Sequence, residues 1–230
     1  MARKKYEFTG ETKEWSGITL RCIRAAIDFT LKSGIEIHKG DLGGWIEKES
    51  NLSHKDSAWV CGNAMVYGTA KVYGDAEVYG NASIYDNARV CGDAEVYDNA
   101  IVYDNARVCD NARVYGDAEV YGNAKVCGDA RVFSSAEVFG NAKVIQSSDV
   151  ICFKNFWSSG RNFTYTRSNG KWAVGCFYGT GEELIKKAYA DSELKGKCYE
   201  ATVKYVEELY KTIEAQQTDK NPKEDKEEKL

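Results

Sequence analysis

A six-residue unit repeats without interruption from Ala58 to Ser147, and it constrains the fold more than any other feature of this chain. Alanine holds the first place of every unit and Val or Ile the third, while Gly, Asp or Asn close most units. The first and third residues share one side of a strand, and the closing residues tolerate the positive φ angles of a tight corner. Because one hexad cannot bury its own Ala and Val, the units must stack. The pattern therefore predicts a mainly β protein built as a parallel β-helix.

The fourth place of the hexad indicates how many units make one coil. Cysteine recurs there every 18 residues, in a column that reads Tyr73, Cys91, Cys109, Cys127, Ile145. The other two columns at this spacing are largely aromatic: Cys61, Tyr79, Tyr97, Tyr115, Phe133 and Tyr67, Tyr85, Tyr103, Tyr121, Phe139. A spacing of 18 residues corresponds to three hexads per coil, so we expect a triangular β-helix of about six coils.

The second, outward-facing place of the hexad collects positive charge on one of the three faces. The residues of this basic column are Lys71, Arg89, Arg107, Lys125 and Lys143. Coils lie ~4.8 Å apart, so neighbouring like charges repel by about 0.9 kcal/mol in water and by less in salt. Two interpretations stay open. Either the side chains splay apart over the cysteine column and pair with corner residues (Asp75, Asp93, Asp110, Asp129), or the column binds an acidic partner, a phosphate-rich ligand or a nucleic-acid backbone.

The aromatic and cysteine columns also allow structural and functional interpretations. Stacked rings on a sheet face stabilise cross-strand pairs by roughly 0.2–1 kcal/mol each. The column Tyr67, Tyr85, Tyr103, Tyr121 could equally form a flat aromatic interface, including the contacts of a trimer. The cysteines of the hexads are interpreted as small packing residues.

Both ends of the repeat change character, which predicts four segments. These are an N-terminal β cap (1–45), the β-helix (46–150), a C-terminal cap of a β-hairpin and two helices (151–215) and a disordered charged tail (216–230). In the C-terminal cap, Arg161, Asn162 and Thr164 offer donors near the helix start at Thr180. They predict either ordinary hairpin architecture or a small pocket for an anionic ligand.

Composition excludes several classes of protein. The net charge is −4, and no apolar run approaches the ~20 residues that a membrane span needs. The start of the sequence has no apolar signal-peptide core, so we expect a cytoplasmic protein. Eight cysteines without a CxxC motif indicate reduced thiols, and the sequence predicts no metal or other cofactor.

Two resemblances extend this interpretation. The AxVxGD/N hexads resemble the left-handed parallel β-helix of the hexapeptide-repeat superfamily, many of whose members are trimeric acyltransferases; this implies a left-handed coil and allows a trimer. The segments ITLRCIRAAIDF, KGDLGGWIEKESNLSHKDSAWV, SSGRNFTYTR and WAVGCFYGTGEELIKKA resemble uncharacterised phage and prophage proteins, over roughly residues 4–210. That resemblance implies an accessory role in the cytosol of an infected cell, such as inhibiting a host defence system through a nuclease complex or a nucleotide signal.

The sequence thus favours a non-catalytic protein that binds a protein partner or an anionic ligand, with nucleic acid as a less favoured alternative. An acyltransferase acting on acyl-CoA is a second hypothesis, and a purely structural protein is a third. Acyl transfer requires a histidine general base. The only histidines are His38 and His54, both before the regular coils, and no inserted loop interrupts residues 58–147 to form an acceptor pocket. We therefore predict no catalytic residue.

Overall fold

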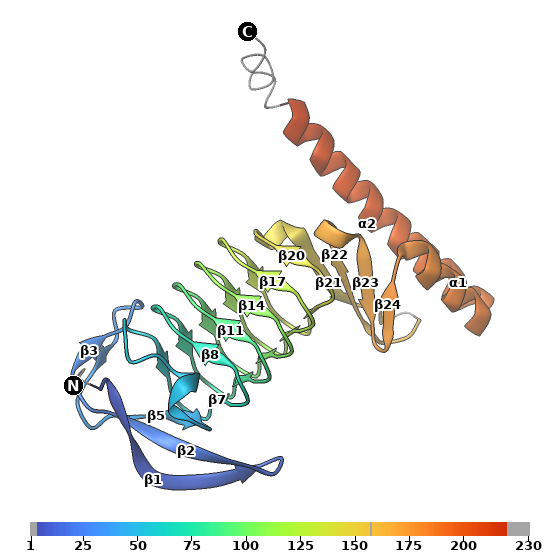
Figure 1. Ribbon diagram of the computed structural model, residues 1–230. Coiled ribbons are helices and arrows are strands. Elements are labelled where there is room, and N and C mark those ends of the chain that lie inside the picture. Colours follow the sequence, from blue (N-terminus) through green and yellow to red (C-terminus); the bar gives the residue numbers. More distant parts are fainter. Residues whose placement is uncertain (1–3, 157, 220–230) are drawn as a thin grey trace.

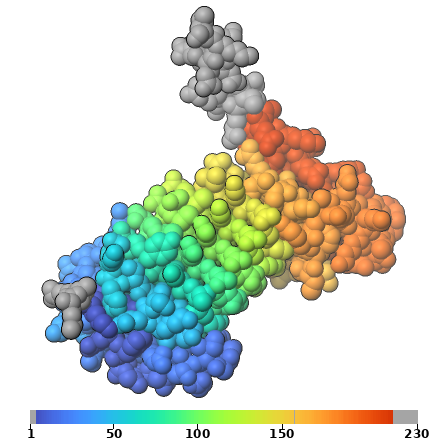
Figure 2. All heavy atoms as spheres, viewed as in Figure 1, coloured from blue at the N-terminus to red at the C-terminus, as the bar shows by residue number. Residues whose placement is uncertain are grey.

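The computed structural model describes residues 4–156 and 158–219. Figure 1 shows a rod of stacked coils, with strands β1 and β2 at one end and a small sheet carrying two helices at the other. In the space-filling view these parts form one continuous elongated body, from which the end of the last helix projects (Figure 2). The solenoid has about six turns of about 18 residues, which confirms the predicted repeat fold.

Three parallel sheets run along the solenoid, and each hexad contributes one two-residue strand. The first sheet contains β7 (Met65–Val66), β10 (Ser83–Ile84), β13 (Ile101–Val102), β16 (Glu119–Val120) and β19 (Glu137–Val138). The second contains β8 (Lys71–Val72), β11 (Arg89–Val90), β14 (Arg107–Val108), β17 (Lys125–Val126) and β20 (Lys143–Val144). The third contains β6 (Trp59–Val60), β9 (Glu77–Val78), β12 (Glu95–Val96), β15 (Arg113–Val114) and β18 (Arg131–Val132).

The interior of the solenoid is filled by the first and third residues of the hexads. Every first-place Ala and every third-place Val or Ile is at most 1% exposed. The fifth residue of each hexad turns the corner, with φ between 55° and 71° in every unit but the last. Glycine adopts this conformation freely, and where Asp replaces it the carboxylate can bond to the next coil: Asp98 accepts from the Gly116 amide at 3.2 Å.

Neighbouring coils are joined by parallel strand ladders, in which each strand both donates to and accepts from the strand of the next coil. The amides of each coil donate to carbonyls of the following coil, as from Arg107 to Ala124 at 2.9 Å. The first and the last coil each lack a neighbouring coil on one side, so each presents both N–H and C=O groups at an open edge. Such edges would pair with other chains if they were left open.

At the last coil, each of the three sheets ends in a strand whose first N–H group donates a hydrogen bond to a side-chain hydroxyl. The Oγ atoms of Ser147, Thr164 and Ser168 accept from the amides of Arg131, Glu137 and Lys143 at 3.2, 3.1 and 2.7 Å respectively. At the first coil, two side chains donate hydrogen bonds to backbone carbonyl oxygens. The buried Nζ of Lys5 donates to Ala58 O at 2.6 Å, and the Tyr6 hydroxyl donates to Leu52 O at 2.9 Å.

The N-terminal cap consists of β1 (Tyr6–Trp15), β2 (Ile18–Ala25), β3 (Phe29–Thr30), β4 (Glu36–Ile37), β5 (Leu42–Ile46) and the 3₁₀ turn Glu49–Asn51. Strand β5 joins the cap to the solenoid, since it pairs antiparallel with β2 and parallel with β7. The first sheet therefore continues through β5 and β2 to β1, inside the segment that was predicted as a separate cap.

The C-terminal cap is a four-stranded antiparallel sheet with two helices. The strands are β21 (Val150–Lys154), β22 (Asn162–Thr166), β23 (Lys171–Val174) and β24 (Phe177–Gly179), in that spatial order, with 3₁₀ turns at Ser147–Asp149 and Arg167–Asn169. The helices are α1 (Gly181–Asp191) and α2 (Glu193–Asp219). One face of the sheet packs on the last coil, through Cys152 for example, and the other packs on the helices through Phe163.

The predicted boundary of the tail was wrong, because α2 continues to Asp219 instead of ending before 216. The rest of the predicted tail, 220–230, lies outside the described residues. Neither helix in the described part of the chain is long and apolar enough to cross a membrane.

Candidate binding face

The five residues of the basic column lie in register on the second sheet. Arg89 is opposite both Lys71 and Arg107, and Lys125 is opposite both Arg107 and Lys143. All five side chains are exposed. Figure 1 shows their strands, β8 to β20, following one another along one side of the rod. Four steps of ~4.8 Å extend the column over about 19 Å.

None of these five side chains forms an ion pair with any residue in the part of the chain that the structure describes. The pairs predicted with four corner aspartates are absent, because each aspartate has another partner. These partners are Ser57 for Asp75, Lys32 for Asp93, the Gly128 amide for Asp110 and Asn111 for Asp129. The interpretation in which the basic column pairs with corner aspartates is therefore not supported. The positive charges of this face are not neutralised by ion pairs with neighbouring side chains.

The other two faces of the solenoid differ from the second sheet, because their outward-facing residues include carboxylates. On the third sheet, Arg113 pairs with Glu95 at 2.8 Å across neighbouring coils. On the first sheet, the Tyr121 hydroxyl lies 3.4 Å from Glu137 as a donor. Burial, with the charge of Glu137, raises the pKa of Tyr121 above its usual range. Arg131 on the third sheet also has no ion pair among the described residues, but only the second sheet carries a full column of such cations.

The aromatic columns form continuous stacks. In the first sheet, neighbouring rings of the column Tyr67, Tyr85, Tyr103, Tyr121, Phe139 lie 4.5–5.1 Å apart and nearly parallel. Tyr178 of β24 continues this stack, with its ring 4.0 Å from that of Phe139. In the third sheet the stack ends at Phe133, which is 49% exposed. The structural interpretation of the tyrosines explains these contacts, whereas an aromatic interface on Tyr67, Tyr85, Tyr103 and Tyr121 stays a prediction.

The cysteine column lies beside the basic column and is half-buried. The ligand atoms of Cys109, Asp110 and Cys127 lie within 4.8 Å of one another, close enough to suggest a metal site. Burial, followed by the charge of Asp110, raises the pKa of the Cys109 thiol to about 12. Metals and electrophiles react with the thiolate, which this environment disfavours at neutral pH. The arrangement therefore fits the packing role that the sequence suggested.

The structure does not bring Arg161, Asn162 and Thr164 together around one pocket. Thr164 is 1% exposed and faces the last coil, where it accepts from the Glu137 amide. Arg161 lies by the helices and lines, with Lys187, a cavity of only about 20 Å³. Such a cavity holds one water molecule at most. Asn162 begins β22, opposite Lys154. The hairpin interpretation of these residues therefore fits the geometry better than a ligand pocket.

The two histidines lie in surroundings that do not suit a general base for acyl transfer. The ring of His54 stacks on Tyr6 at 4.2 Å, its Nε2 lies 3.5 Å from Glu49, and burial lowers its pKa. His38 is exposed and lines an open cavity of about 330 Å³ together with Glu36 and Asp28, whose charges would repel the phosphates of a coenzyme A.

Sequence reasoning missed two apolar grooves beside strand β21. One is a cavity of about 620 Å³ between β21 and α2, and the other, of about 330 Å³, lies between β21 and the last coil. The only sequence signal is the alternation of Ile151 and Phe153 with smaller or polar residues, which is typical of any half-buried strand.

Comparison with known proteins supports the repeat. Residues 94–110 and 106–122 match the model of the YdcK beta solenoid repeat, so this part of the chain is similar to that family. No curated protein matches the chain.

Proposed function

We propose that this protein is a non-catalytic binding protein whose solenoid presents the basic column to an acidic surface of a macromolecular partner. The observation that carries the proposal is the alignment of five exposed cations without an ion pair among the described residues. In water, each neighbouring pair at ~4.8 Å destabilises the folded state by about 0.9 kcal/mol before screening. A bound polyanion would reverse the sign of this contribution.

The architecture supports recognition by preorganisation. Each cation is attached to a strand that is hydrogen-bonded to both neighbouring coils, or to one at the end of the sheet, so the backbone sets the spacing of the charges. A partner therefore meets a fixed row of cations, and ordering entropy is lost only in the side chains.

The resemblance of the flanking segments to phage and prophage proteins gives this proposal a biological setting. In that setting the acidic partner is a macromolecular component of a host defence system, such as a nuclease complex, in the cytosol of the infected cell. This part of the proposal depends on the resemblance, whereas the binding face depends on the geometry of the second sheet.

The test compares the wild type with the triple variant Arg89→Gln, Arg107→Gln, Lys125→Gln. Glutamine keeps most of each aliphatic stem, so the sheet face stays covered while three charges are removed. The control variant Lys39→Gln, Lys55→Gln, Lys186→Gln has the same net charge and changes three exposed lysines elsewhere. Each protein is used to capture partners from host lysate, with and without nuclease treatment, over a range of salt concentrations.

We expect the wild type and the control variant to capture the same partner and the triple variant to lose it. If the partner is duplex nucleic acid, five phosphate contacts give a salt slope of about −4.5, and the triple variant lowers its magnitude by about 2.7. Equal capture by the triple variant would refute the proposed binding face.

A further inference from the structure

Strand β21 is an edge strand of the C-terminal sheet, and an apolar groove lies along each of its two faces. It pairs with β22 alone, because the spatial order of the sheet is β21, β22, β23, β24. We call the 620 Å³ cavity between β21 and α2 the helix-side groove, and the 330 Å³ cavity between β21 and the last coil the solenoid-side groove. Both are distinct from the basic column on the second sheet.

The main chain of β21 is available for another strand. Asn155 N–H donates to Arg161 O at 2.9 Å, and the pairing of β21 with β22 continues in the same register. Antiparallel pairs alternate between hydrogen-bonded and open positions. Cys152 and Lys154 therefore direct their N–H and C=O groups away from β22, and no residue in 4–156 or 158–219 is hydrogen-bonded to these groups.

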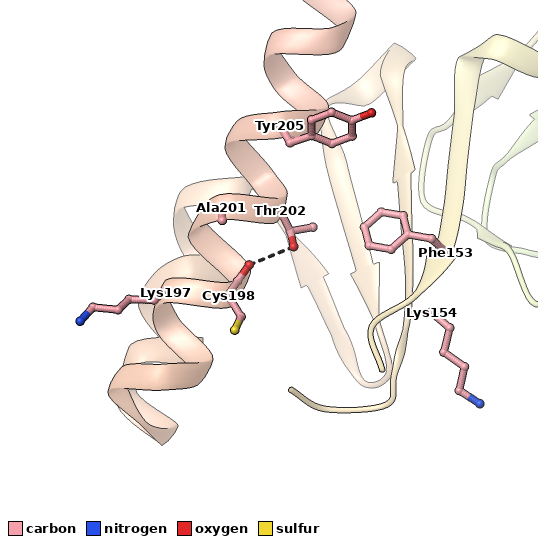
Figure 3. A pocket seen from close by; sticks show the side chains of 7 residues that line it. All are labelled: Phe153, Lys154, Lys197, Cys198, Ala201, Thr202 and Tyr205. Carbon is pink, nitrogen blue, oxygen red and sulfur yellow. Dashed lines mark hydrogen bonds between the residues drawn. The ribbon is translucent and has the colours of Figure 1, made fainter. Parts of the chain in front are cut away.

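The helix-side groove is mainly apolar, with Lys154 at its rim. Figure 3 shows the ring of Phe153 pointing toward α2, with Tyr205 on the helix facing the same space. Tyr205 is 66% exposed, so most of its aromatic ring is left uncovered. Lys154 lies at one end of the groove, whereas the side chain of Lys197 points away from Phe153 and pairs with Glu193 at 3.1 Å.

The solenoid-side groove has the same character on a smaller scale. It is lined by the exposed ring of Phe133, which ends the aromatic stack of the third sheet, and by Val150 and Cys152 of β21. Arg131 supplies a cation there. The two faces of β21 thus offer a larger and a smaller apolar groove, and each has one basic side chain beside it, Lys154 and Arg131 respectively, that forms no ion pair among the described residues.

We propose that β21 is a docking site for an extended segment of a partner protein, which adds to the sheet as a fifth strand. Successive side chains of a strand point to opposite faces, so alternate residues of the segment enter the two grooves. The segment carries large apolar residues on the helix side, smaller apolar residues on the solenoid side, and acidic residues at its ends that complement Lys154 and Arg131.

The chemistry of the grooves favours a partner over a segment of this chain. The sequence after Asp219 is KNPKEDKEEKL, whose apolar residues are Pro222 and the terminal Leu230. This sequence lacks the alternating apolar side chains that two grooves require, and its proline cannot donate to a strand ladder.

The test uses a fluorescein-labelled peptide, Glu-Val-Phe-Thr-Leu-Val-Glu, titrated with the full-length protein and followed by fluorescence anisotropy. Two further peptides carry backbone N-methyl groups, one at Phe and Leu and the other at the two Val residues. Only one of these sets of amides faces β21 in an added strand. We expect one methylated peptide to bind at least about tenfold more weakly than the other.

A protein variant tests the groove itself. Ala201 is exposed on α2 and lines the helix-side groove, so Ala201→Glu places a carboxylate there without disturbing the core. Ala190→Glu, at an exposed position on α1, is the matched control. We expect Ala201→Glu to weaken peptide binding by at least about tenfold and Ala190→Glu to leave it unchanged.

Three results would overturn the proposal. The first is no binding of the unmethylated peptide to the wild type at concentrations of about 1 mM. The second is equal affinity of the two methylated peptides, which would show contact without strand addition. The third is a wild-type dimer in sedimentation experiments that Ala201→Glu dissociates, which would assign the grooves to a second copy of this chain.

Discussion

Lys5 offers a direct test of how the first coil is closed. Its side chain is 2% exposed, and Nζ donates to the carbonyl oxygens of Ala58, Asp56 and Lys55 at 2.6, 3.2 and 3.4 Å. Burial lowers the pKa of Lys5 from 10.5 to about 8. At about 1.36 kcal/mol per pH unit, this fall corresponds to about 3 kcal/mol against the charged form in the folded protein.

The sign of the pH dependence follows from the direction of this pKa change. Between about pH 8 and 10.5 the unfolded chain holds more protons on Lys5 than the folded chain does. The free energy of unfolding therefore rises with pH through this window, and the contribution of Lys5 becomes more favourable by roughly 2–3 kcal/mol from pH 7 to pH 10.

The assay is chemical denaturation of the wild type and of Lys5→Met from pH 7 to pH 10. Cysteine and tyrosine residues also titrate in this range, but they are common to both proteins, so the difference between the two curves isolates Lys5. Lys55→Met, at an exposed neighbouring lysine, serves as the control. We expect the difference between wild type and Lys5→Met to rise with pH, and a flat difference would refute the argument that a charged lysine is buried at this end.

Three further substitutions test the closure of the last coil, the corners and the basic column. Thr164→Val removes the acceptor of the Glu137 amide, so we expect a loss of about 1–3 kcal/mol and faster amide exchange at Glu137. Gly92→Ala places a Cβ atom 2.8 Å from a backbone nitrogen of the next coil at φ 68°, so thermal unfolding should show a loss of more than about 1 kcal/mol. Arg107→Gln removes the repulsion of this residue with Arg89 and with Lys125, so it should raise stability in low salt by at most about 1.7 kcal/mol.

The glycine prediction has a matched control variant, and each of the other two has an outcome that would contradict it. Gly160→Ala has a similar φ of 62° but nothing within 4 Å of the added Cβ, so it separates backbone strain from the clash at Gly92. Equal losses at the two glycines would contradict the close approach of the coils. Unchanged exchange at Glu137 in Thr164→Val would show that the hydroxyl does not close the edge. A loss of stability in Arg107→Gln would indicate that this arginine has a stabilising partner.

The hexad repeat by itself determined the solenoid, because its period of six residues sets the strands and its period of 18 sets the coils. It also placed the basic column on one face, since residues 18 apart in a regular coil must lie in register. The resemblance and the strand patterns at the two ends predicted caps, but these segments have no repeat from which their packing could be deduced.

Only the tertiary structure decided which partner each polar or charged side chain contacts. The sequence offered corner aspartates as partners for the basic column, but these aspartates form hydrogen bonds to neighbouring coils or, for Asp93, an ion pair with Lys32 of the N-terminal cap. It grouped Arg161 with Thr164, but strand geometry sends these residues to opposite faces of the sheet. The grooves beside β21 arise from the last coil, one strand and a helix packed together. A local pattern specifies the face on which a side chain lies, whereas its partners depend on segments far away in the sequence.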